Sequence, residues 1–187
     1  MSQTKQTQSL SLELKALEEK DGLGTFEGHA AVFGNVDSYK DIIEPGAFAR
    51  SIQHRIASTG KAAFPILFNH DPMEPIGVTL SVAEDAKGLA VKGELNLNVQ
   101  RGREVYALLK QGALSGLSIG FRTIQADMDS AGIRHLKEVQ LYEWSPVVFP
   151  ANELAQTTNV KAEGNATDPD SSELKLHLAL LNAALNA

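Results

Sequence analysis

The sequence predicts a mostly β fold with peripheral helices (α+β), built as a partly closed, bent β-barrel of about six to seven strands. Segments that alternate apolar and polar residues recur at short spacing along most of the chain. Turn signals rich in glycine and aspartate separate these segments, and two of the intervening segments show helical periodicity. This pattern favours a strongly curved sheet that carries its helices on the outside.

Composition places the chain among ordinary globular proteins. Its 187 residues suit one domain with a sizeable core, and 43% of them are hydrophobic while 21% are charged. The net charge of −6 disfavours non-specific binding to nucleic acids or anionic membranes. The absence of cysteine excludes disulfides and thiolate nucleophiles, and the polar N-terminus lacks the apolar core of a signal peptide. We therefore expect a cytoplasmic protein with no nucleic-acid or membrane partner.

The N-terminal part of the chain predicts two strands and a loop. Residues 1–8 are polar, and we expect them to form a disordered lead. Leucines alternate with other residues over 10–19, which predicts a strand. After a glycine-containing turn, residues 25–35 predict a second strand whose glycines indicate bulges. Residues 36–48 then predict a loop.

The middle of the chain predicts a helix, a short strand and a hairpin. Phe48, Ile52 and Ile56 lie four residues apart, as on one face of a helix, and Gly60 is a stop signal. A short apolar strand follows and runs into a polar tip at 69–71. Two alternating segments around the turn sequence Asp-Ala-Lys-Gly then predict a β-hairpin.

One more helix and two long strands complete the predicted domain. We expect Asn98 to cap a helix over about 99–111, which Gly112 ends. A strand over 116–126 and its return over 133–149 follow, joined by a polar turn.

The composition changes after the predicted domain, which spans residues 9–157. Residues 158–171 are polar and contain glycine and proline, which indicates a linker. Residues 172–187 carry leucines at helical spacing and predict a C-terminal amphipathic helix. Such a helix either docks onto its own domain, mediates self-association or attaches to a partner protein.

Four polar side chains are candidates for chemistry, and each also has an ordinary structural interpretation. His70 follows an apolar strand at a rigid strand end, although a surface turn histidine has the same pattern. Ser118 shares a strand face with Gly120, which leaves space beside the hydroxyl, although a serine on a solvated face is commoner. Glu143 lies among apolar residues, where a carboxylate must be exposed or paired, and Glu138 has similar standing.

The sequence does not indicate a metal or nucleotide site. None of the five histidines shows the HExxH spacing of a zinc enzyme. No glycine-rich segment has the form of a phosphate-binding loop. We therefore expect neither a metal ion nor a cofactor.

Four sequence blocks occur in an order and at a spacing that point to a known family. They are VDSYKDIIEPGAF at 36–48, FNHDPMEPIG at 68–77, LSGLSIGF at 114–121 and YEWSPVVFPAN at 142–152. Together they closely resemble the prohead maturation proteases of tailed phages, which are distantly akin to the herpesvirus assemblins. The resemblance covers about residues 10–155. It implies an assemblin-like fold, with the protease domain at 9–157.

The resemblance also implies a function and a place of action. The expected activity is that of a serine endopeptidase that cleaves scaffold and major capsid proteins, and itself, during head maturation. The expected location is the phage prohead within the host cytoplasm. Assemblins act as dimers, so a homodimer is a further implication.

The same resemblance assigns a Ser-His-acidic triad. The family's histidine block falls on His70, and its serine block falls on Ser118 rather than Ser115. The acidic member falls on Glu143, with Glu138 as the reserve.

Residues around the triad take supporting roles by analogy. Backbone N–H groups near Ala151 and Asn152 are expected to bind the oxyanion, as in assemblins. Arg122 is a further candidate, although a solvated strand arginine fits its position as well. Gly120 is expected to let a substrate backbone approach the Ser118 hydroxyl.

Two other functions stay open on the sequence. One is a non-catalytic capsid-assembly or scaffold-binding domain of the same fold, and the other is a β-barrel peptide-binding module. Both predict that Ser118 is dispensable and unreactive toward a serine-directed probe.

Overall fold

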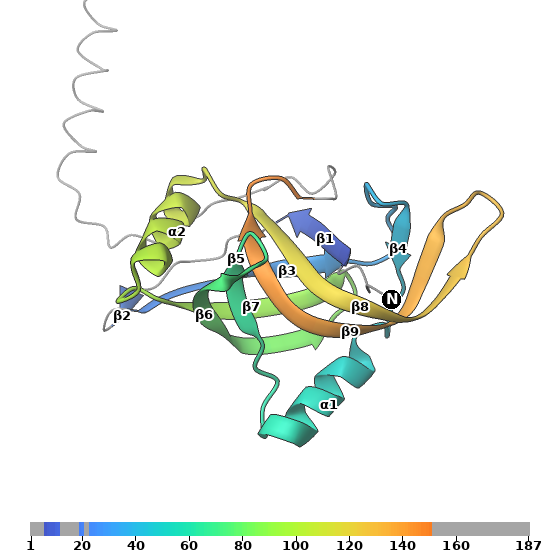
Figure 1. The fold of residues 1–187 in the computed structure, drawn as a ribbon, viewed down its shortest axis with the longest axis horizontal. Helices are drawn as coiled ribbons and strands as arrows, with labels where there is room; N and C mark the ends of the chain where they lie inside the picture. The colour runs from blue at the N-terminus through green and yellow to red at the C-terminus, as the bar shows by residue number, and fades with distance from the viewer. Residues whose placement is uncertain (1–5, 12–18, 21–22, 151–187) are drawn as a thin grey trace, which may run out of the picture.

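The computed structural model describes residues 6–11, 19–20 and 23–150, which form a curled β-sheet with two helices (Figure 1). The strands are β1 (Gln6–Ser11), β2 (Glu19–Lys20), β3 (Leu23–Val32), β4 (Asp41–Ile43), β5 (Pro65–Phe68), β6 (Asp71–Glu84), β7 (Gly88–Asn96), β8 (Gly116–Met128) and β9 (Arg134–Val147). The helices are α1 (Ala49–Thr59) and α2 (Gln100–Gln111). The predicted linker at 158–171 and helix at 172–187 lie outside the described residues.

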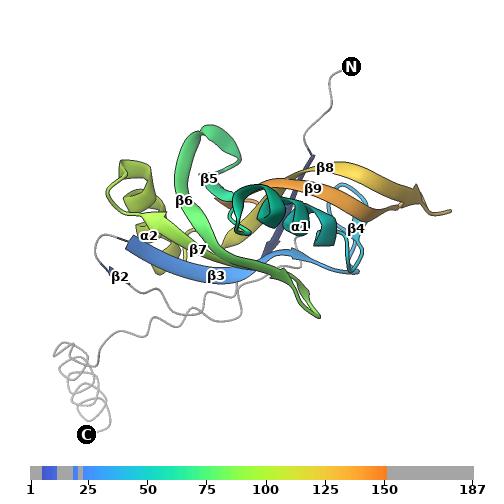
Figure 2. The same cartoon turned by 90° about the horizontal axis from the view of Figure 1, so that it is seen from below.

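The strand order shows how the sheet closes. It runs β1-β8-β9-β5-β6-β7-β3-β2, with β4 added alongside β9. Most neighbours are antiparallel, but β4 and β5 each run parallel to β9. Toward the far end of this order β3 contacts β1 and β8, so the sheet curls back on itself as a partly closed barrel (Figures 1 and 2). The predicted mostly β fold with a bent sheet is confirmed, and six strands, β3 and β5 to β9, form its body.

Local turn chemistry fixes the β6–β7 hairpin, as the sequence predicts. The Asp85 carboxylate accepts hydrogen bonds from the backbone N–H groups of Lys87 and Gly88, at 2.8 and 2.9 Å. An aspartate that binds the backbone two or three residues ahead reproduces a tight turn. The two flanking strands therefore pair directly.

The helix ends follow the sequence more closely than the helix starts. Gly60 and Gly112 end α1 and α2 in the left-handed region, with φ of 78° and 76°. The predicted Asn98 cap is wrong, because Val99 occupies the N-cap position and no side chain caps α2. The Asn96 side chain instead accepts a bond from the Asn98 N–H at 2.9 Å and closes the turn before the helix. Neither of the two described helices is long and apolar enough to cross a membrane.

Two short strands begin in segments where the sequence predicts no strand. β1 begins at Gln6, within the segment 1–8 that was expected to be a disordered lead, and pairs antiparallel with β8. β4 lies within the predicted loop 36–48 and pairs parallel with β9. Each pairing uses the backbone edge of a strand about 90 or more residues away in the chain, which a local pattern does not reveal.

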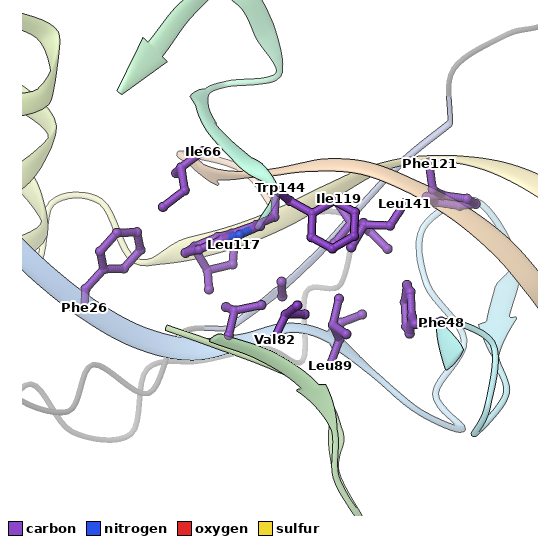
Figure 3. Packing of buried hydrophobic residues seen from close by; sticks show 14 of the residues in the cluster. Phe26, Phe48, Ile66, Val82, Leu89, Leu117, Ile119, Phe121, Leu141 and Trp144 are labelled. Carbon is purple, nitrogen blue, oxygen red and sulfur yellow. The ribbon is translucent and has the colours of Figure 1, made fainter. Parts of the chain in front are cut away.

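The core fills the inside of the curl (Figure 3). Trp144 is fully buried there, and its ring lies 5.2 Å from that of Phe26. Its indole N–H donates to Thr79 Oγ1 at 2.7 Å, so the polar end of the ring is also satisfied. Because side chains alternate along a strand, Trp144 pointing inward turns Glu143 and Ser145 to the outer face of β9.

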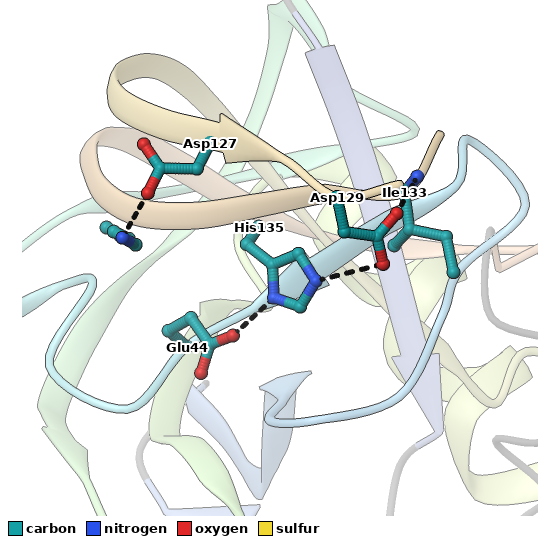
Figure 4. Close-up of polar contacts among 6 residues, drawn as sticks. Glu44, Asp127, Asp129, Ile133 and His135 are labelled. Atoms are coloured by element: carbon teal, nitrogen blue, oxygen red, sulfur yellow. Dashed lines mark hydrogen bonds and ion pairs between the residues drawn. The ribbon is translucent and has the colours of Figure 1, made fainter. Parts of the chain in front are cut away.

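Charged contacts hold the far end of the β8–β9 hairpin to the segment around β4. Asp41 is buried and pairs with the Arg134 guanidinium, with 2.7 Å between Oδ1 and Nε. His135 Nδ1 lies 2.6 Å from Glu44 Oε1, and its Nε2 lies 3.5 Å from Asp129 Oδ2 (Figure 4). These contacts keep the two hairpin strands in place beyond the body of the sheet.

Candidate active site

The β8–β9 pairing places two candidate side chains on one face of the sheet. The register sets Ser118 opposite Ser145 and Gly120 opposite Glu143. Residues directly opposite each other, and residues two apart on one strand, point to the same face. Ser118 and Glu143 therefore both face outward, away from the core that Trp144 anchors.

The β5 strand delivers the histidine to the same place. β5 runs parallel to β9, with Ile66 beside Trp144, so the turn after β5 reaches the end of β9. The Asn69 N–H donates to the Pro146 carbonyl at 3.2 Å and ties that turn to β9. His70 is the next residue and extends its ring over the face that carries Ser118.

The three side chains form a continuous hydrogen-bonded line. His70 Nε2 lies 2.5 Å from Ser118 Oγ. On the other side of the ring, His70 Nδ1 lies 2.7 Å from Glu143 Oε1. A hydroxyl, an imidazole and a carboxylate in this order are the arrangement of a serine nucleophile, its base and the acid that orients the base.

The turn that carries the histidine has an uncommon backbone. Asn69 and His70 both have positive φ, at 49° and 61°. Left-handed geometry costs about 1–2 kcal/mol for a residue with a side chain, so the surrounding contacts must hold it. The bonds from the Asn69 and His70 N–H groups to β9 are such contacts.

The burial of these residues disagrees with the ordinary interpretations of a surface turn histidine and a solvated strand face. Ser118 is fully buried and Glu143 is 2% exposed, so neither lies on a solvated strand face. The His70 side chain is 16% exposed and is bonded on both ring nitrogens, unlike a free surface-turn histidine. A carboxylate this buried is retained only when it is paired, and the imidazole is its partner here.

Ser145 is a polar residue of the site that the sequence reasoning missed. It is fully buried, donates to Glu143 Oε2 at 2.7 Å and accepts from the His70 backbone N–H at 3.2 Å. The available signal was its position two residues after Glu143, which places both on one strand face.

The remaining predicted residues lie apart from this line. Glu138 is bonded to Arg50 of α1, with 3.2 Å between Oε2 and Nη1, and so does not meet the imidazole. Arg122 donates to Gln140 on the exposed part of the hairpin at 2.8 Å. Ser115 precedes β8 and is half-buried. The proposed oxyanion residues Ala151 and Asn152 lie outside the described residues.

The glycine at the start of β8 permits a close approach of the end of β9. A Cβ atom on Gly116 would lie 2.8 Å from the Val147 carbonyl oxygen and 3.0 Å from Pro150 Cδ. Any larger residue at 116 would therefore push away the segment that leads out of the site. The close approach of these two segments explains why position 116 is occupied by glycine.

A metal site does not accompany these residues. Within 6–11, 19–20 and 23–150, no group of three or more histidine, cysteine, aspartate or glutamate residues is placed to hold an ion.

Comparison with known families shows which family the chain belongs to. The profile of the caudovirus prohead serine proteases matches residues 10–169. The chain belongs to this family. The resemblance that the four sequence blocks indicated is thereby confirmed.

Individual members of the family show the same relation. The chain is 39% identical over 142 residues to the prohead protease of Enterobacteria phage HK97, covering 74% of this chain and 61% of that protein. It is 33% identical over 153 residues to the prohead protease of Escherichia phage T5, covering 81% and 69%. The chain thus spans less than two thirds of the length of the HK97 protein.

One solved structure supports the fold of this family member. The capsid assembly protease of bacteriophage T4 aligns with a TM-score of 0.61 at 15% identity, covering 78% of this chain and 98% of that one. The protease of varicella-zoster virus aligns at a TM-score of 0.38, a likeness too low to support the fold. The T4 likeness agrees with the curled sheet and its two helices.

Proposed function

We propose that this chain is a serine endopeptidase that cleaves scaffold and capsid proteins, and itself, during phage head maturation. The observation that carries the proposal is the unbroken line from Ser118 Oγ through the His70 ring to Glu143 Oε1, at 2.5 and 2.7 Å. Membership of the prohead serine protease family supports the same activity. The proposed substrates are supported by the name of that family and by the likeness to a protein described as a capsid assembly protease.

In the proposed mechanism, Ser118 Oγ attacks the carbonyl carbon of the peptide bond. Neutral His70 takes the hydroxyl proton through Nε2 as the new C–O bond forms. Glu143 accepts a bond from Nδ1–H, which fixes the tautomer and stabilises the imidazolium. The proton then passes to the leaving amine as the C–N bond breaks, and water releases the acyl group by the same steps.

Donors for the oxyanion are a separate part of the proposal. A backbone N–H that binds the tetrahedral oxygen is worth about 2.7–4 kcal/mol of transition-state stabilisation. We assign this role to the segment at Ala151 and Asn152, which follows β9. Gly116 supports the assignment, because it lets the end of β9 and Pro150 lie against the start of the serine strand.

Gly120 is proposed to give a substrate backbone access to Ser118. It is buried in β8, two residues after the serine and on the same strand face. The lack of a side chain at this position is proposed to leave room for a peptide beside the hydroxyl.

Co-expression tests the proposal directly. The full chain is produced together with scaffold and major capsid proteins, and the products are resolved by mass. We expect cleavage with the wild type and none with Ser118→Ala. A non-catalytic assembly domain of the same fold would give the same products with both chains, and that result would contradict the proposal.

A further inference from the structure

We infer that Ser145 is a positioning residue, through which the base and the acid of the triad are held together. The inference rests on the proposed function, because it assigns a role within the same site. Ser145 lies directly opposite Ser118 across the β8–β9 pair and two residues after Glu143. All three side chains therefore share one face of the sheet.

The Ser145 hydroxyl is directed by its two partners. Its oxygen accepts from the His70 backbone N–H at 3.2 Å, so its hydrogen is available to the carboxylate. That hydrogen is donated to Glu143 Oε2 at 2.7 Å. The same carboxylate uses its other oxygen, Oε1, for the His70 ring at 2.7 Å. One hydroxyl thus connects the acid to the backbone of the base.

Burial makes this connection energetically important. Ser145 is fully buried and Glu143 is 2% exposed, so water does not readily replace a lost donor. A hydrogen bond donated to a carboxylate favours its charged form. An ionised Glu143 with a fixed orientation is what the imidazolium needs when it forms during attack.

The second contact acts on the histidine turn. His70 has a φ of 61°, and its N–H is held by the Ser145 oxygen at the end of β9. A strained turn persists when its surroundings determine it. We therefore expect that removing the Ser145 hydroxyl weakens two contacts together. These are the contact between the His70 ring and Ser118 and the contact between the Glu143 carboxylate and the His70 ring.

The test measures the rate at which a fluorophosphonate probe labels Ser118 in the full chain. Ser118 Oγ bonds to phosphorus, fluoride leaves, and His70 takes the proton, so the rate reports nucleophile activation. We expect Ser145→Ala to lower the second-order rate about 10- to 100-fold, as for a lost hydrogen bond to a charged group. Ser51→Ala is the matched control, because Ser51 Oγ accepts the Leu141 N–H of β9 at 2.9 Å away from the triad. It should label at nearly the wild-type rate.

A double mutant separates positioning from a general loss of structure. In a Glu143→Gln background, adding Ser145→Ala should cost less than about 3-fold, because residues that act as a unit are not additive.

The outcomes are distinguishable from a failure of the proposed function. If the wild type labels Ser118 and Ser145→Ala labels equally fast, or if the losses from Glu143→Gln and Ser145→Ala multiply, the positioning role is wrong. If the wild type takes no label at Ser118, the serine nucleophile itself is wrong. Should Ser145→Ala fail to fold, Ser145→Cys keeps the volume with a much weaker donor and is held to the same criteria.

Discussion

Glu143 and Glu138 lie on the same strand but have different partners, and this difference supports Glu143 as the proposed acid of the triad. Glu143 bonds the His70 ring in a buried position, whereas Glu138 bonds Arg50 with its side chain 21% exposed. An acid that fixes the histidine tautomer has a large effect on turnover. A surface ion pair, by contrast, contributes little to stability.

Replacing each glutamate by glutamine should therefore give opposite results. Glu143→Gln should lower kcat about 10⁴-fold, because the amide stabilises the wrong tautomer and not the imidazolium. Glu138→Gln should cleave at nearly the wild-type rate. Single-turnover cleavage of purified scaffold protein measures both variants. Full activity in Glu143→Gln together with a large loss in Glu138→Gln would reverse the assignment.

At the scale of elements, β7 contributes a glycine that the buried tryptophan of β9 requires. A Cβ atom on Gly93 would lie 2.5 Å from Ile66 Cδ1 and 2.6 Å from Trp144 Cη2. Both side chains are fully buried, so little room exists for them to move.

Gly93→Ala should therefore destabilise the protein by about 1–3 kcal/mol, as overpacking of a core does. Urea unfolding measures the change, and Lys92→Ala on the exposed side of the same strand is the control. Unchanged stability in Gly93→Ala would show that β7 and β9 are not packed as closely as the distances indicate.

The hairpin end of β8 and β9 carries a pH-dependent contact. Hydrogen bonding to Glu44, and then to Asp129, raises the pKa of His135 above its ordinary value of 6.5 (Figure 4). A raised pKa means that the folded state favours the protonated ring. The stabilisation is therefore full at pH values below about 6.5 and is lost as the pH rises through the raised pKa.

Comparison of wild type with His135→Asn tests this contact. The wild type should melt at a higher temperature than the variant at pH 6, and the difference should shrink at pH 8.5. Thermal unfolding at both pH values measures it. A difference that grows with pH would mean that the neutral ring is the stabilising form.

At the scale of the whole molecule, the sequence predicted elements whose signals are local. The β6–β7 hairpin and the glycine ends of both helices were found because Asp85, Gly60 and Gly112 act on their immediate neighbours. The start of β1 and the whole of β4 were missed because their partners lie far along the chain. The curl of the sheet was predicted only as a class, since the register that closes it is set by long-range pairing.

The site divides in the same way. The sequence singled out His70, Ser118 and Glu143 by position and by family resemblance. It did not show that the three side chains meet on one face of the sheet. That depends on the β8–β9 register and on the parallel run of β5 beside β9. Ser145 was missed because its partners, a backbone N–H from one strand end and a carboxylate oxygen, are visible only in three dimensions.

The most direct measurement of the central claim is the position of a fluorophosphonate adduct on the full chain. The claim is that the His70 imidazole activates the Ser118 hydroxyl for attack. Mass spectrometry of digested, labelled protein should place the adduct on Ser118, and His70→Ala and Ser118→Ala should each abolish it. An adduct on another residue, or labelling of Ser118 that persists in His70→Ala at the wild-type rate, would contradict the account.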